Sequence, residues 1–127
     1  MGLILDTNAI SAAADENLLV AELLARANEV ALPVVAIGEY RYGISQSRYK
    51  ARYWAWLDEF IRDARVLQVE ELTTRYYAEI RVDLRKTGKP IPTNDLWISA
   101  LCRQHGLSLL SRDRHFDLVP GIDRIEW

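Results

Sequence analysis

The chain has 127 residues, half of them hydrophobic, and a formal net charge of −2. This length suffices for one compact domain with its own core, so we expect a single domain over residues 1–127. The small negative charge gives no general attraction to nucleic acid or to an anionic membrane, so local cations would have to hold a polyanionic partner. One cysteine excludes an internal disulfide, and no apolar run approaches the length of a membrane span. We therefore expect no membrane contact and a cytoplasmic location.

Short apolar runs alternate with segments of helical periodicity in the first third of the chain. The run at residues 2–5 ends at Asp6, Thr7 and Asn8, which is typical of a buried strand followed by a capped helix. The periodicity then predicts helices over residues 17–28 and 34–44, with a strand between them at residues 29–32.

The same alternation continues to the end of the chain. Helices are predicted over 48–63 and 72–85, a third helix is capped by residues 93–95 and stopped by Gly106, and strands are predicted at 65–69, 107–110 and 122–127. Alternating strands and helices predict an α/β fold with a parallel sheet covered by helices on both faces. Ligands of such sheets bind beyond the carboxyl ends of the strands.

Four acidic residues stand in apolar or turn settings where a bare carboxylate is unexpected: Asp6, Glu39, Asp95 and Asp113. An ionised carboxylate is costly to bury unless a cation neutralises it. Hard divalent ions such as Mg²⁺ prefer oxygen ligands of this kind. The four acids together therefore predict a metal site.

Each acid also has a purely structural interpretation. Asp6, Asn94 with Asp95, and Asp113 could cap helices or form turns, as these residue types commonly do. Glu39 fits this interpretation less well, because it lies within the apolar run 34–40 of a predicted helix. Arg41 is a poor partner for Glu39, since neighbouring positions of a helix point in different directions.

Four segments of the sequence resemble motifs of a known family. They are Leu5-Asp6-Thr7-Asn8, Ile37-Gly38-Glu39-Tyr40 with Gly43, Asn94-Asp95-Leu96-Trp97-Ile98-Ser99-Ala100, and Ser111-Arg112-Asp113-Arg114-His115-Phe116 followed by Val119-Pro120-Gly121. In order and spacing they resemble PIN-domain proteins of the VapC type, which are the ribonuclease toxins of bacterial and archaeal toxin–antitoxin pairs. The resemblance covers essentially the whole chain. It implies a PIN-like three-layer α/β/α domain with a central, mostly parallel sheet.

The resemblance also implies roles for individual residues. Mg²⁺ or Mn²⁺ would be held by the four acids already named, with polar support from Thr7, Asn8, Asn94 and Ser111. Family members vary at the fourth acid, so Asp117 is an alternative to Asp113. The implied function is a metal-dependent endoribonuclease that hydrolyses RNA phosphodiester bonds, inhibits translation or growth, and is neutralised by a VapB-type antitoxin.

Contacts with partners are less specific in the sequence. Arg112 and Arg114 flank Asp113 and are candidates for RNA contact, although exposed arginines usually only interact with solvent. Apolar side chains of the predicted helix at residues 48–63 spread over an arc wider than one core-facing stripe. Packing against two neighbours explains this arc, and so would the antitoxin contact and the homodimer that the resemblance implies. A non-catalytic PIN-like module that binds RNA or a protein partner remains the alternative function.

Overall fold

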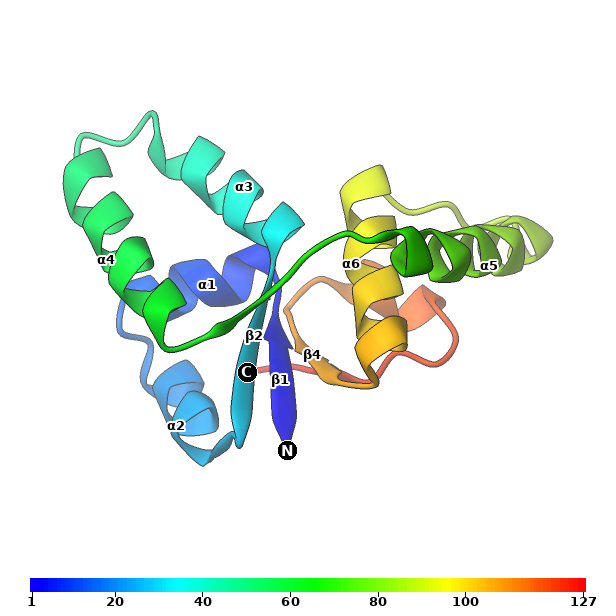
Figure 1. The fold of residues 1–127 in the computed structure, drawn as a ribbon, viewed down its shortest axis with the longest axis horizontal. Helices are drawn as coiled ribbons and strands as arrows, with labels where there is room; N and C mark the ends of the chain where they lie inside the picture. The colour runs from blue at the N-terminus through cyan, green and yellow to red at the C-terminus, as the bar shows by residue number, and fades with distance from the viewer.

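A five-stranded parallel sheet forms the centre of the computed structural model, which describes all residues 1–127 (Figure 1). The strands lie in the order β3-β2-β1-β4-β5. In chain order the elements are β1 (Gly2–Leu5), α1 (Thr7–Ala14), α2 (Leu18–Arg26), β2 (Glu29–Pro33), α3 (Val34–Ile44), α4 (Lys50–Arg62), β3 (Arg65–Leu67), α5 (Glu71–Thr87), α6 (Thr93–His105), β4 (Ser108–Leu110), the 3₁₀ helix η1 (Arg114–Leu118) and β5 (Arg124–Ile125).

Strand β1 is the central strand and is buried over its last three residues. Its residues Leu3, Ile4 and Leu5 have no exposed surface. A strand with neighbours on both sides and helices over both faces must be apolar at every position, which is why this run does not alternate with polar residues. Ile4 is paired with Ala31 of β2 on one side and Leu109 of β4 on the other.

The direction of strand addition changes between β1 and β4. The chain first adds β2 and β3 on one side of β1, and later adds β4 and β5 on the other. Such a switch point opens a crevice at the carboxyl ends of the two strands concerned. Leu5 and Leu110 are paired in the register of β1 and β4. The residues that follow them, Asp6 and Ser111, therefore leave the sheet side by side.

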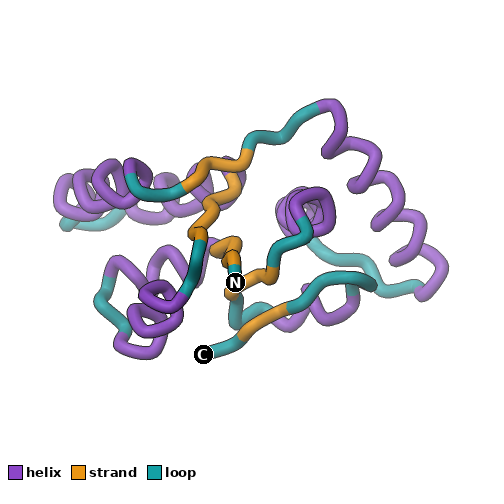
Figure 2. The backbone as a smooth tube through the Cα atoms, turned by 60° about the horizontal axis from the view of Figure 1, so that its bottom comes forward, coloured by secondary structure: helices purple, strands orange, loops and turns teal.

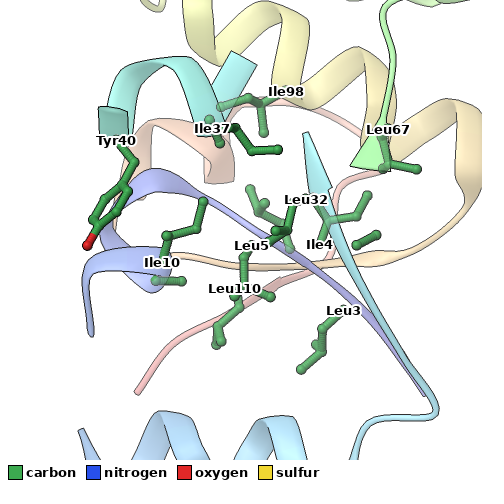
Figure 3. Close-up of a cluster of buried hydrophobic side chains, with 14 of the residues drawn as sticks. Leu3, Ile4, Leu5, Ile10, Leu32, Ile37, Tyr40, Leu67, Ile98 and Leu110 are labelled. Carbon is green, nitrogen blue, oxygen red and sulfur yellow. The ribbon is translucent and has the colours of Figure 1, made fainter. Parts of the chain in front are cut away.

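Helices cover both faces of the sheet. Figure 1 shows α1, α2 and α4 on one side and α5 and α6 on the other, and Figure 2 shows α6 between the strands and α5. The main core contains twenty buried residues from the sheet and the helices around it (Figure 3). A second, six-residue core between α5 and α6 is formed by Ile80, Leu84, Ile91, Leu96, Ala100 and Val119. Helix α5 is thus attached mainly through α6.

The predicted α/β fold with helices on both faces of a parallel sheet is confirmed, and α3 has the predicted bounds. The predicted cap of α6 is wrong: the helix begins at Thr93 after Pro92, so Asp95 lies inside its first turn. The strand predicted at 122–127 is limited to Arg124 and Ile125, which pair with Leu109 and Leu110 of the short strand β4. The 3₁₀ helix η1 was not predicted.

The other element boundaries differ from the prediction by a few residues. Strand β3 stops at Leu67 instead of residue 69, and α4 spans Lys50–Arg62 instead of residues 48–63. Helix α5 is longer than predicted and ends where Gly88 adopts a left-handed conformation, with φ of 67°. Only glycine adopts that conformation without strain, so Gly88 provides the stop. No helix combines the length and the apolar character that crossing a membrane requires.

Candidate metal centre

The carboxylates of four separate elements meet in one cavity at the carboxyl end of the sheet. Asp6 follows β1, Glu39 lies within α3, Asp95 lies in the first turn of α6, and Asp113 follows β4. All four line a cavity of about 460 Å³. The convergence predicted from strand ends and helix starts is therefore present in the structure.

Asp6 is both a helix cap and a member of this cavity. It is only 5% exposed, and its Oδ1 accepts a hydrogen bond of 2.8 Å from the backbone N–H of Thr7 at the start of α1. Its Oδ2 accepts a second bond of 2.7 Å from the Ser111 hydroxyl. Burial raises the pKa of Asp6, and these two hydrogen bonds oppose the increase.

Ser111 connects the two strand ends. Its fully buried hydroxyl donates to Asp6 and accepts a bond of 2.9 Å from the backbone N–H of Asp113. Asn8 reinforces the connection, because its Nδ2 donates to the Ser111 hydroxyl at 3.4 Å and its Oδ1 accepts from the backbone N–H of Arg112 at 3.3 Å. Asn8 Nδ2 also lies 3.4 Å from Asp6 Oδ2. The predicted supporting residues Asn8 and Ser111 thus hold Asp6 and Asp113 in fixed relative positions.

Asp95 and Asp113 face each other across a histidine. His115 Nδ1 lies 3.0 Å from Asp113 Oδ1 and 3.4 Å from Asp95 Oδ2. The three side chains offer ligand atoms that all lie within 4.8 Å of one another. Burial, and then the charges of Asp113 and Asp6, raise the pKa of Asp95 to about 6, while His115 opposes the increase.

His115 was not predicted as part of the site. It is half exposed and follows Asp113 by two positions. The hydrogen bond of 2.9 Å from the His115 backbone N–H to Asp113 Oδ1 starts η1, and this turn directs the imidazole back toward the acids. An Asp-x-His spacing was the only signal in the sequence, and it is too common to single out a residue by itself.

Glu39 closes the cavity from the α3 side. The Thr7 hydroxyl donates to Glu39 Oε1 over a long distance of 3.5 Å. Arg41 points elsewhere, as the sequence predicted: it is bound to Asp58 at 3.0 Å and lies over the Trp54 ring at 4.4 Å. No lysine or arginine forms an ion pair with any of the four acids of the cavity.

Several predicted residues lie outside this arrangement. Asn94 is exposed, makes no side-chain hydrogen bond and does not line the cavity. Asp117 is held by Arg124 through bonds of 2.8 and 2.9 Å, so Asp113 is the fourth acid of the cavity. Arg112 stacks over the Trp127 ring at 4.7 Å, and Arg114 is exposed.

The donor set suits a hard divalent cation. Its ligand atoms are carboxylate oxygens, with one imidazole beside them, which is the chemistry that Mg²⁺ and Mn²⁺ accept. No lysine or arginine is paired with these acids, and burial, with a smaller contribution from neighbouring carboxylates, raises the pKa values of Asp6 and Asp95. Fold and site together define an α/β domain with a cluster of carboxylates at the switch point of a parallel sheet.

Sequence and structure comparisons identify the family within this class. A family model of the PIN domain matches residues 3–122, so the chain belongs to the PIN-domain family. Ribonuclease VapC2 of Rickettsia felis is 30% identical over 107 residues, which are 84% of this chain and 80% of that protein. The tRNA(fMet)-specific endonuclease VapC of Shigella flexneri is 27% identical over 94 residues, covering 73% of this chain and 71% of that protein.

Solved structures agree with this placement. VapBC2 from Rickettsia felis, bound to a DNA fragment from their promoter, contains a chain similar to this one with a TM-score of 0.88 and 27% identity, covering 100% of this chain and 99% of that one. The toxin–antitoxin system VapBC-5 from Mycobacterium tuberculosis contains another, with a TM-score of 0.78 and 27% identity, covering 99% and 98%.

Proposed function

We propose that this protein is a metal-dependent endoribonuclease and the toxin of a toxin–antitoxin pair. The observation that carries the proposal is the cavity in which Asp6, Glu39, Asp95 and Asp113 meet without a compensating lysine or arginine. Such a charge excess suits a protein that must bring divalent cations to a phosphodiester. Similarity to ribonucleases of the VapC group supports RNA as the substrate.

Each side chain has a distinct task in the proposed reaction. The four acids would hold the ion, while Ser111 connects Asp6 to the backbone of Asp113 and Thr7 donates to Glu39. When bound, Mg²⁺ or Mn²⁺ supplies a more acidic water as nucleophile and stabilises the additional negative charge of the phosphoryl group. His115 Nδ1 lies within hydrogen-bonding distance of both Asp95 and Asp113 and helps to hold these two side chains in position.

We further propose that a VapB-type antitoxin binds over α4. The supporting observation is a shallow hollow on the outer side of this helix, lined by Lys50, Ala51, Trp54, Ala55 and Asp58. Arg41 and Lys50 lie over the Trp54 ring at 4.4 and 5.6 Å, so an apolar surface with cations at its edge is available to an acidic or aromatic segment. RNA contacts of Arg112 and Arg114, a homodimer and a cytoplasmic location stay predictions.

The test is cleavage of a mixed RNA pool with Mn²⁺, with Mg²⁺ and with excess chelator, alongside calorimetric titration of the protein with Mn²⁺. Asp6→Asn and Asp95→Asn should abolish cleavage and weaken Mn²⁺ binding. Asp113→Asn should do the same, whereas Asp117→Asn, which removes the same charge four residues away, should leave both unchanged. If the wild type neither binds Mn²⁺ saturably nor cleaves RNA in either metal, the protein is a non-catalytic binding module.

A further inference from the structure

A second cavity, of about 470 Å³, lies at the end of α5 and carries the opposite charge to the metal centre. Its polar walls contain three cations, Arg81, Arg85 and Lys89, and no carboxylate. Its floor is apolar and consists of Leu84, Ile91 and Leu96 from the smaller core. On a chain with a net charge of −2, a cavity that contains only positive charge is a local exception.

The three cations are free to bind an anion. None of them forms an ion pair with the protein's own acids. Arg81 is positioned without being neutralised, because its guanidinium donates to the Tyr77 hydroxyl at 3.0 Å and lies 5.9 Å from the centre of that ring. Asp83, the nearby acid of α5, is bound to Arg103 at 3.5 Å. A guanidinium held in place in this way loses little conformational entropy on binding a phosphate.

The first turn of α6 separates this cavity from the metal centre. Thr93 and Leu96 line the basic cavity, while Asp95 lines the acidic one. At 100° per residue, Asp95 points away from the face shared by Thr93 and Leu96, so the two cavities lie on two sides of one helix. The two cavities are therefore separated by about 10 Å, which is the diameter of a helix with its side chains. A flexible single strand a few nucleotides long can reach both cavities.

We infer that this basic cavity is a subsite for the RNA substrate, in which Arg81, Arg85 and Lys89 bind a backbone phosphate and the apolar floor receives the adjoining nucleoside, away from the phosphodiester that is cut. The inference rests on the proposed ribonuclease function. A free phosphate would need only the cations, whereas a nucleotide also uses the apolar floor. The subsite also supplies the local positive charge that the overall composition of the chain lacks.

Cations near the end of a helix have a simpler role, because they interact favourably with the helix dipole. Lys86 separates the two roles: it lies in the last turn of α5 beside Arg85 but does not line the cavity. Lys89 offers the complementary case, since it lines the cavity but follows the end of the helix at Gly88. If the cations serve only the helix dipole, substitutions of Arg85 and Lys86 should have equal effects on RNA binding. If the cavity is a subsite, substitutions of Arg85 and Lys89 should weaken RNA binding and a substitution of Lys86 should not.

The experiment measures fluorescence anisotropy of a labelled single-stranded RNA of about ten nucleotides, within the usual site size of single-strand binders. Arg85→Glu, Lys89→Glu and Lys86→Glu are compared in the Asp95→Asn protein, which should not cleave the probe. We expect the Kd to rise about tenfold for Arg85→Glu and for Lys89→Glu, but at most about twofold for Lys86→Glu, and the salt slope to decrease by about 0.7 per lost phosphate contact. Melting temperatures are measured for all variants to check that each is folded.

Equal effects of the three substitutions on RNA binding would overturn the subsite, and so would no effect of any. Loss of antitoxin binding with RNA binding unchanged would also overturn it, because the cavity would then serve a protein segment. Cleavage by the proteins that keep Asp95 separates the two proposals: Arg85→Glu should raise KM and leave kcat unchanged. If all variants cleave RNA with the wild-type KM, the subsite proposal is refuted and the ribonuclease proposal is retained. If the wild type binds no Mn²⁺ and cleaves nothing, the ribonuclease itself fails.

Discussion

Replacing Asp95 by asparagine should stabilise the metal-free protein at neutral pH. Asp95 is buried beside Asp113 and Asp6, and its pKa of about 6 lies above the value near 3.9 that an unfolded chain would show. Between these values the folded protein binds more protons than the unfolded one, so its stability decreases as the pH rises from about 4 to about 6. Above pH 6 the full penalty of the ionised carboxylate is present, and the neutral amide of asparagine removes it.

The size of the stabilisation follows from the shift in the pKa of Asp95. A shift of about two pKa units corresponds to at most about 3 kcal/mol in the free energy of unfolding, and solvent in the open cavity reduces this to about 1–2 kcal/mol. For a domain of this size that is about 3–8 °C in Tm. Asparagine keeps an oxygen that can accept from His115, so the local hydrogen bonding is largely retained.

Circular dichroism melts in excess chelator between pH 4 and pH 8 provide the measurement. Asp95→Asn should match the wild type near pH 4 and exceed it at pH 7.5, while Glu59→Gln, which removes an exposed acid of α4, should change Tm little at either pH. With Mn²⁺ added, the wild type should have the higher Tm, because ligand binding stabilises only the protein that retains its metal site. A metal-free Asp95→Asn protein that melts below the wild type at pH 7.5 would refute the reasoning.

Three further outcomes can be checked with the same proteins. The apparent affinity for Mn²⁺, measured by calorimetry, should decrease as the pH falls below about 6, because protons then compete for Asp95; a flat profile would exclude Asp95 as a ligand. Ser111→Ala should cost about 1–3 kcal/mol in urea unfolding, since it leaves buried groups of Asp6 and Asp113 without a partner, whereas Ser45→Ala on the surface should cost under about 0.5 kcal/mol. Trp54→Ala should weaken antitoxin binding at least about tenfold without changing Mn²⁺ binding, with exposed Tyr42→Ala as the control, and unaltered antitoxin affinity would remove α4 from the interface.

Features that depend on strand ends could be predicted from the sequence. The run at 2–5 is apolar at every position, which predicts a buried strand with Asp6 at its carboxyl end. The same reasoning placed Asp113 near the end of the strand at 107–110. Glu39 was found because a carboxylate on an apolar helix is costly. The positions of these acids could be predicted because buried segments leave a recognisable pattern of apolar residues in the sequence.

Features that depend on side-chain direction or on packing between helices could not be predicted. His115 is half exposed, so no hydrophobic pattern marks it, and only the turn at Asp113 directs it toward the acids. The cap assigned to residues 93–95 was wrong because Pro92 already supplies the extended residue before α6. The basic cavity needs Arg85 from α5 and Leu96 from α6 to meet across the smaller core, a pairing that neither helix encodes alone.

The surroundings of Asp6 favour the chemical interpretation of the acids over the purely structural one. As a cap, Asp6 needs only one oxygen, the Oδ1 that accepts from Thr7, and asparagine caps a helix about as well. The second oxygen accepts from Ser111, which an amide oxygen could also do in another orientation. The negative charge is the one property that neither bond requires, and burial makes it costly, as the raised pKa shows. Capping therefore explains the position of Asp6 but not its charge, whereas the divalent cation that we propose for the cavity would explain both.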